Sequence, residues 1–293
     1  MDPWLIVFGL GVGILVGTTG MGGGSLMTPL LILVFGIQPV VAVGSDLAYA
    51  AITKTAGGLL HFRRGTVQTS LAWWLAAGSC PGAVAGVVLL DRLGLEGALI
   101  PLIAAALLLT GALVLYRALM SNTGRERPTV ELETRHKVAA VVLGASVGFL
   151  LGLTSAGSGT LIAVGLIVGF RLAPRNVVGT DVFHAAILLW VAAIAHLFSG
   201  NVDLGLTATI LIGSLPGVWL GTHLSARLPE RGLRPALGVV LLASGLALLT
   251  KAGVDIPAAV IVAVPLVVGA GAFLVLRQRP PLAAKPLVPR AEA

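Results

Sequence analysis

Two glycine- and hydroxyl-rich stretches interrupt apolar segments of this chain, and they carry the residue types that bind anions. The first, "TTGMGGGSL", covers residues 18–26, and the second, "LTSAGSGTL", covers residues 153–161. A broken helix leaves backbone N–H groups without helical partners, and the helix N-terminus that follows carries a partial positive charge. Glycine lets a ligand approach that backbone closely. Two such breaks brought together would form an uncharged anion cradle.

The candidate substrate-binding residues of this cradle are the glycine and hydroxyl residues of both stretches. They are Thr19, Gly22, Gly23, Gly24 and Ser25 in the first stretch and Thr154, Gly157, Ser158, Gly159 and Thr160 in the second. The alternative is that these glycines only allow close helix packing, as small residues do in membranes. Their repetition with hydroxyls attached favours the anion site. Neither stretch has the spacing G-x-x-x-x-G-K-[ST], which excludes a nucleotide P-loop.

Four ionisable residues lie inside apolar segments, where charge is costly and usually faces the bundle interior. Asp46 and Asp181 follow glycines in "VGSDLAYA" and "VGTDVFHA". They either couple a proton or cation and orient a site donor, or cap a helix that starts late. Lys54 either attracts the anion as a substrate-binding residue or extends toward the cytoplasmic end. His184 either titrates near physiological pH or makes a packed polar contact.

Composition restricts the class of protein. The 293 residues have a mean hydropathy of +1.01 and only 11% charged residues, whereas soluble domains have about 25%. Long apolar runs recur along the chain, which predicts an all-α polytopic membrane protein. The net charge of +7 is not a nucleic-acid signal, because the basic residues lie in short loops and tails beside apolar segments. We predict no cofactor and no metal, and the single cysteine, Cys80, excludes an internal disulfide.

The chain consists of two copies of one unit. Residues 12–93 align with residues 147–228 without a gap, and 30 of the 82 pairs are identical. Matches of the rarer residue types carry most weight, and they pair Thr19 with Thr154, Pro39 with Pro174, Asp46 with Asp181, His61 with His196, Pro81 with Pro216 and Arg92 with Arg227.

Each copy predicts five apolar segments. They lie at roughly 4–20, 24–36, 40–61, 67–90 and 97–117, and then at roughly 138–154, 158–170, 175–198, 204–226 and 233–250. Each short second segment is too short for a crossing of about 20 residues, so we expect it to form a broken or re-entrant hairpin with its predecessor. The predicted organisation is a first membrane repeat (1–120), a cytoplasmic linker (121–137), a second repeat (138–250), an extra transmembrane helix (251–276) and a disordered cytoplasmic tail (277–293).

The distribution of basic residues predicts the topology. If each hairpin returns to its own side and the other segments cross, one side collects sixteen of the nineteen Lys and Arg residues. That side is expected to be cytoplasmic, with the N-terminus outside and the C-terminus inside. Arg63–Arg64 in the first copy becomes Phe198–Ser199 in the second. Basic residues therefore follow the membrane side rather than the repeat position, which predicts an inverted repeat, a common plan of secondary transporters.

The pattern "GxxxGTTGMGGGSLMTPLL" followed by "VAVGSDLAYAAITKTAGGLLHFRRGTV" resembles the TauE/SafE family of sulfite exporters. The second half resembles the family's second copy through "GLTSAGSGTL" and "VVGTDVFHAAI", and the resemblance covers about residues 9–250. It implies a carrier of the cytoplasmic membrane that moves small sulfur-containing anions. We therefore predict a secondary transporter, an exporter, whose partners are a small anion and the lipid bilayer; a homo-oligomer is left open.

Three alternatives to an exporter are kept. One is a proton-coupled anion importer. Another is an intramembrane enzyme, such as a serine protease with a histidine base within reach of its serine; Ser158 and His196 are the candidates, but His196 is predicted near the outer surface. The third is a non-transporting membrane subunit, which the inverted repeat disfavours because such symmetry serves alternating access.

We expect single cysteines placed in loops 62–66 and 199–203 to react with a membrane-impermeant reagent from opposite sides of the membrane. These loops are repeat equivalents, so an inverted pair must expose them on opposite faces. The measurement compares labelling of intact cells with labelling of inverted vesicles, after Cys80 has been replaced. Labelling of both loops from one side would contradict the inverted repeat.

Overall fold

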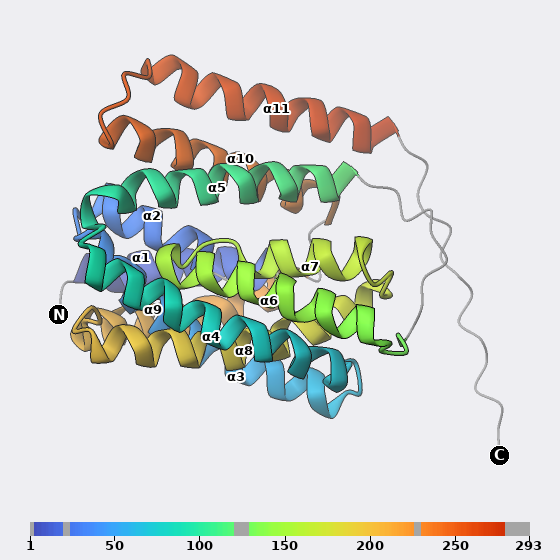
Figure 1. Ribbon diagram of the computed structural model, residues 1–293. Helices are drawn as coiled ribbons and strands as arrows, with labels where there is room; N and C mark the ends of the chain where they lie inside the picture. The colour runs from blue at the N-terminus through green and yellow to red at the C-terminus, as the bar shows by residue number, and fades with distance from the viewer. Residues whose placement is uncertain (1–2, 20–23, 120–128, 226–229, 279–293) are drawn as a thin grey trace.

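The computed structural model describes residues 3–19, 24–119, 129–225 and 230–278, and this part of the chain is all helical (Figure 1). In lipid a helix satisfies its own backbone groups, so each long apolar run becomes one. The helices of the first copy are α1 (Pro3–Thr19), α2 (Gly24–Val34), α3 (Pro39–Arg63), α4 (Thr69–Leu93) and α5 (Glu96–Leu119). Those that follow are α6 (Thr134–Thr154), α7 (Ser158–Val168), α8 (Pro174–Phe198), α9 (Leu204–Ser225), α10 (Glu230–Lys251) and α11 (Ala258–Gln278).

The second helix of each copy is short, as predicted. Helices α2 and α7 have 11 residues each, too few for a crossing of about 20. Among the described residues, six helices are long and apolar enough to cross a membrane, namely α4, α5, α6, α8, α9 and α11. Helices α3 and α8 begin at Pro39 and Pro174, where the fixed φ of proline favours a first turn. The suggestion that Asp46 and Asp181 cap late-starting helices is therefore wrong.

The most extensive helix contacts join one copy to the other. Helix α1 packs on α9, and α4 packs on α6. Because α1 is the repeat equivalent of α6 and α4 is that of α9, the two pairs are equivalent, with the copies exchanged. The equivalent helices α3 and α8 also pack together, as do α5 and α10. Gly44, early in α3, lies beside Asn201 after the end of α8, and Gly58, late in α3, lies beside Phe183 in the first half of α8. Helices α3 and α8 are therefore antiparallel.

Glycines at every fourth position let the cross-copy pairs approach closely. A Cβ added at Gly13 of α1 would lie 2.4 Å from the carbonyl oxygen of Ser214 in α9. At the equivalent Gly148 of α6 it would lie 2.1 Å from the carbonyl oxygen of Ser79 in α4. Backbone meets backbone here, which is how small residues drive helix association in membranes. The same contact recurs at Gly9 and Gly17 of α1 and at Gly144 and Gly152 of α6.

Each copy also holds a turn of the other. The Ser45 hydroxyl of α3 accepts a hydrogen bond from the Asp203 N–H, directly before α9, at 3.0 Å. The equivalent Thr180 hydroxyl of α8 accepts one from the Gln68 N–H, directly before α4, at 3.0 Å. The Gln68 side chain in turn donates to the Val130 carbonyl at 2.6 Å. The described part of the linker is thus docked on the bundle.

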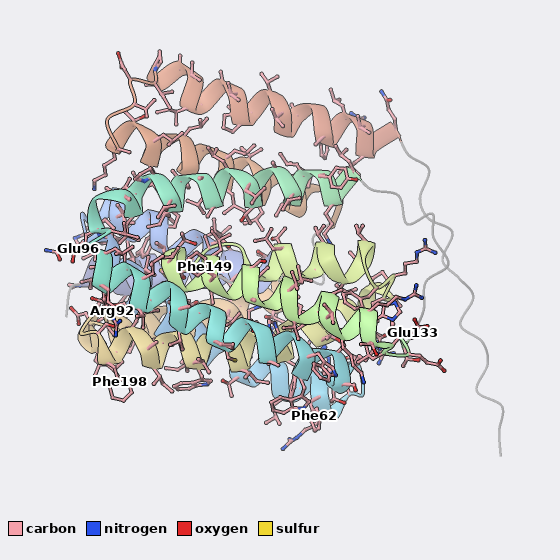
Figure 2. All side chains as sticks on the ribbon, viewed as in Figure 1. Phe62, Arg92, Glu96, Glu133, Phe149 and Phe198 are labelled. Carbon is pink, nitrogen blue, oxygen red and sulfur yellow. The ribbon has the colours of Figure 1, made fainter. Side chains whose placement is uncertain are left out.

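The equivalent turns lie at opposite ends of the bundle. Figure 2 shows Phe62 and Glu133 at one end and Phe198, Arg92 and Glu96 at the other. This arrangement is the one expected if the two copies run in opposite directions. Their insertion in opposite senses into a bilayer stays a prediction.

Large apolar side chains cover much of the outer surface. Trp4 is 73% exposed, Trp219 is 63% exposed and Val267 of α11 is 71% exposed. Helix α11 packs on α10 at the edge of the bundle (Figure 1), and most of its apolar residues are exposed. A surface of this kind is suited to lipid, where it carries no cost.

We expect Gly13→Ala to destabilise the protein and Gly11→Ala, in the same helix, to leave it at least as stable. The added methyl at Gly13 meets Ser214 backbone, whereas nothing lies within 4 Å of one at Gly11. Overpacking of this kind costs about 1–3 kcal/mol. Thermal unfolding in detergent checks this, and equal midpoints for both variants would contradict the proposed close packing of α1 on α9.

Candidate functional site

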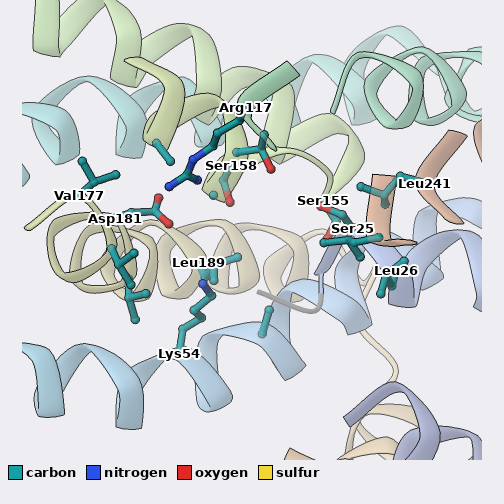
Figure 3. A pocket seen from close by; sticks show the side chains of 17 residues that line it. Ser25, Leu26, Lys54, Arg117, Ser155, Ser158, Val177, Asp181, Leu189 and Leu241 are labelled. Carbon is teal, nitrogen blue, oxygen red and sulfur yellow. The ribbon is translucent and has the colours of Figure 1, made fainter. Parts of the chain in front are cut away.

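A cavity of about 80 Å³ lies between the two copies, where the two helix breaks meet (Figure 3). Ser25 lines it from the start of α2, and Ser155 lines it from the break between α6 and α7. Ser158, Gly159 and Thr160 line it from the first turn of α7. Ser25 and Thr160 are repeat equivalents, so both copies contribute the same kind of donor. No side chain caps α7 at Gly157, which leaves its first turn facing the cavity.

Of the candidate residues in the first glycine stretch, Ser25 is the one whose side chain the structure describes. Gly22 and Gly23 lie outside the described residues. Thr19 ends α1 and Gly24 begins α2, so these two residues mark the break itself.

Two residues of the second stretch shape the turn and do not line the cavity. Thr154 is buried, and its hydroxyl donates to the Leu150 carbonyl at 2.7 Å and accepts from the Ala156 N–H at 3.3 Å. Gly157 has a left-handed φ of +92°, and a Cβ there would lie 2.8 Å from Thr110 Oγ1. Glycine is required at this position by the backbone conformation and by the neighbouring helix.

Two cationic side chains enter the cavity from different helices. Lys54 extends from α3 and Arg117 extends from the last turn of α5. Figure 3 shows them approaching Asp181 and Ser158 from opposite sides. Of the two interpretations of Lys54, this position supports the anion-attracting one. The sequence pattern does not single out Arg117, because a basic residue at the end of an apolar segment ordinarily marks the cytoplasmic side.

Asp181 lines the same cavity and lies against the start of α7. Asp181 is 7% exposed, and a Cβ built on Gly159 would lie 3.3 Å from Asp181 Oδ2. A carboxylate at a helix N-terminus is stabilised by the partial positive charge there. Asp181 therefore occupies the kind of position that a bound anion would take.

Asp46, the repeat equivalent of Asp181, has a different environment. It is fully buried, and its Oδ2 accepts hydrogen bonds from Thr28 and from Ser155, each at 2.7 Å. Thr28 belongs to α2, whereas Ser155 belongs to the break in the other copy. Asp46 therefore joins both breaks and orients Ser155, without lining the cavity itself.

The two buried histidines of α8 make packing contacts outside the cavity. His184 Nε2 lies 2.8 Å from Ser79 Oγ of α4, which supports the packed polar contact among its two interpretations. His196 Nε2 donates to the Gly152 carbonyl at 2.8 Å and is fully buried against neighbouring helices, near the end of α8. Its expected position near the outer surface of the membrane stays a prediction. Ser158 lines the cavity and His196 does not. Within the described residues, no group of three or more His, Cys, Asp or Glu side chains is placed to hold a metal ion.

Comparison with known proteins identifies the family. A sequence model described as "Sulfite exporter TauE/SafE" matches residues 5–248. The chain belongs to the TauE/SafE family. The resemblance predicted from the two motifs is thereby confirmed.

Curated relatives of this TauE/SafE chain carry the names of membrane transporters. The probable membrane transporter protein YjnA of Bacillus subtilis (strain 168) is 39% identical over 261 residues, covering 85% of this chain and 100% of the relative. YdhB of the same organism, with the same description, is 30% identical, covering 81% of this chain and 96% of the relative. No solved structure matches. The protein is a membrane transporter.

We expect Thr28→Val to lower the free energy of unfolding by about 1.5–3 kcal/mol, because it removes one of two hydroxyl donors to a buried carboxylate. Thr209→Val is the matched control. Thr209 is also buried, but its hydroxyl donates only to the Gly205 carbonyl of its own helix at 2.7 Å. Chemical or thermal unfolding in detergent measures both variants. Equal losses would show that the Thr28–Asp46 bond has no special role.

Proposed function

We propose that this TauE/SafE protein is a secondary transporter that exports a small, sulfur-containing anion across the cytoplasmic membrane. One observation carries the proposal: Lys54 and Arg117 converge with the first turn of α7 and four hydroxyl residues on a cavity between the two copies. Cations, hydroxyls and a helix N-terminus are the donors that recognise oxyanions. A cavity of about 80 Å³ suits an inorganic anion or a very small organic one.

The position of the cavity supports loading from the cytoplasm. Its lining runs from Ser25 and Ser155 in the interior to Arg117 in the last turn of α5 and Val177 near the start of α8. Both of those helix ends lie at the end of the bundle that carries Phe62 and Glu133 (Figures 1 and 2). We propose that this end is cytoplasmic, that the C-terminus faces the same side, and that the N-terminus faces out.

The membrane potential supplies the driving force in this scheme. An anion that leaves a cell with an inside-negative potential gains about 2.3 kcal/mol per charge per 100 mV. Export of a monoanion therefore needs no coupled ion. Neither Asp46 nor Asp181 has to change protonation during the transport cycle. Because this scheme requires no chemical conversion of the anion, we favour a carrier over an enzyme or a non-transporting subunit.

The competing importer has one specific point in its favour, which is Asp181 in the cavity. A proton-coupled importer needs a carboxyl group that meets the substrate and changes protonation, and Asp181 is the carboxylate among the described lining residues. The two mechanisms differ in which gradient drives the flux. Clamping the potential and the pH gradient separately therefore distinguishes them.

We expect purified protein in liposomes to move radiolabelled sulfite in response to membrane potential, with no requirement for a pH gradient. Lys54→Gln and Arg117→Gln should each reduce this flux at least tenfold, since each removes one of two cations that face the anion. Arg92→Gln, at the opposite end of the bundle, is the matched control and should keep full flux.

Other outcomes would favour the alternatives. Flux that ignores potential, follows the pH gradient and disappears in Asp181→Asn or Asp46→Asn would establish the importer. Conversion of the label to a new chemical species would indicate an enzyme. Absence of flux for sulfite, thiosulfate and sulfoacetate would leave the non-transporting subunit as the better proposal.

A further inference from the structure

The cavity contains an unequal set of charges. Among the described residues that line it, the charged side chains are Lys54, Arg117 and Asp181. Two cations and one carboxylate give this set a net charge of one positive unit. The first turn of α7 adds a partial positive charge to the same space. The Asp181 carboxylate thus places a negative charge beside any anion that Lys54 and Arg117 attract.

The carboxylate of Asp181 lies where it must affect the bound anion directly. It is in contact range of Gly159 in the first turn of α7, and Figure 3 shows both cationic side chains directed toward it. Its Oδ1 is buried and has no hydrogen-bond partner among the described residues. No described donor holds the Asp181 Oδ1 away from the cavity. An anion that binds to Lys54 and Arg117 therefore comes close to the Asp181 carboxylate.

The comparison with Asp46 shows that this arrangement is not a consequence of the repeat. Asp46 receives two hydroxyl donors and lies outside the cavity lining. In the second copy the position of Thr28 is taken by Ala163, so the donor that holds Asp46 has no counterpart at Asp181. Oδ1 of each carboxylate is buried without a hydrogen-bond partner among the described residues. The difference lies in Oδ2, which has two hydroxyl donors in Asp46, and in position, because Asp181 lines the cavity and Asp46 does not.

We infer that Asp181 selects the charge of the transported anion: its carboxylate repels a second negative charge, so that the site prefers a singly charged oxyanion to a doubly charged one of the same shape. This inference rests on the proposed function, because it assigns a role at the same anion site. A dianion brings a second negative charge into a space of low dielectric constant beside Asp181, where repulsion is weakly screened. Removal of that carboxylate removes this repulsion.

Methanesulfonate and sulfate are suitable probes. Both have a tetrahedral sulfur, and they differ by the replacement of one charged oxygen with a methyl group. Isothermal titration calorimetry on the detergent-solubilised protein at constant ionic strength gives both dissociation constants. We expect the wild type to bind methanesulfonate at least tenfold more tightly than sulfate. In Asp181→Asn the ratio of the two constants should shift at least tenfold toward sulfate.

Three further variants control for other effects of the substitution. Asp255→Asn neutralises an exposed carboxylate in the turn between α10 and α11, away from the cavity lining, and should keep the wild-type ratio. The double variant Arg117→Gln, Asp181→Asn restores the net charge of the lining and should return the ratio toward that of the wild type. If Asp181→Asn does not purify as a folded protein by thermal unfolding, Asp181→Ser makes the same change in charge with a smaller side chain.

The outcomes distinguish a failure of this inference from a failure of the proposed function on which it rests. If both anions bind and Asp181→Asn leaves their ratio unchanged, Asp181 does not select charge, and the anion site itself stands. If the wild type binds neither anion and transports no sulfite, the proposed function fails and the inference fails with it. A wild-type preference for sulfate would also overturn the inference, whatever the variants show.

Discussion

A helix that breaks inside a membrane must find partners for the backbone groups that the break exposes, and this constraint organises the centre of the protein. The Gly157 N–H before α7 donates to Ser25 Oγ of the other copy at 3.3 Å. At the far end of α2, the ammonium group of Lys251 donates to the Ile32 carbonyl at 2.8 Å, which is favourable at a helix C-terminus. The first turn of α7 faces the cavity, and an anion could bind to the backbone N–H groups of that turn.

The close glycine packing is what makes the meeting of the two breaks feasible. Helices α1 and α6 end at the breaks, and each packs backbone to backbone on a long helix of the other copy. Because such pairs cannot separate or slide without losing extensive van der Waals contact, the position of each break is fixed relative to the other copy. The interpretation of glycine as a packing residue is therefore correct for Gly13 and Gly148. It does not account for Gly157, whose positive φ belongs to the turn.

Much of the fold follows from the sequence, and much of the site does not. The internal alignment predicts the two copies and the short α2 and α7, because the repeated pattern of apolar runs and prolines determines where helices begin. The role of Arg117 was missed, since its position beside the linker matches the general rule for basic residues at membrane borders. The different roles of Asp46 and Asp181 were also missed, although the exchange of Thr28 for Ala163 is visible in the alignment. The consequence of that exchange for Asp181 depends on which side chains of the two copies are in contact, and the alignment does not contain this information.

The cavity lies between two copies of one unit, yet its chemistry belongs to differences between them. Ser25 and Thr160 are equivalent donors on the two sides, whereas Lys54 faces the cavity at the position where the second copy has Leu189. A strictly symmetric site would place a second lysine in the cavity beside Lys54 and Arg117, and three cations would hold an anion more tightly. A carrier must also release its substrate, so such strong binding would work against turnover. One lysine opposed by one apolar residue, together with the Asp181 carboxylate beside it, keeps the site attractive to an anion and limits how tightly that anion is held.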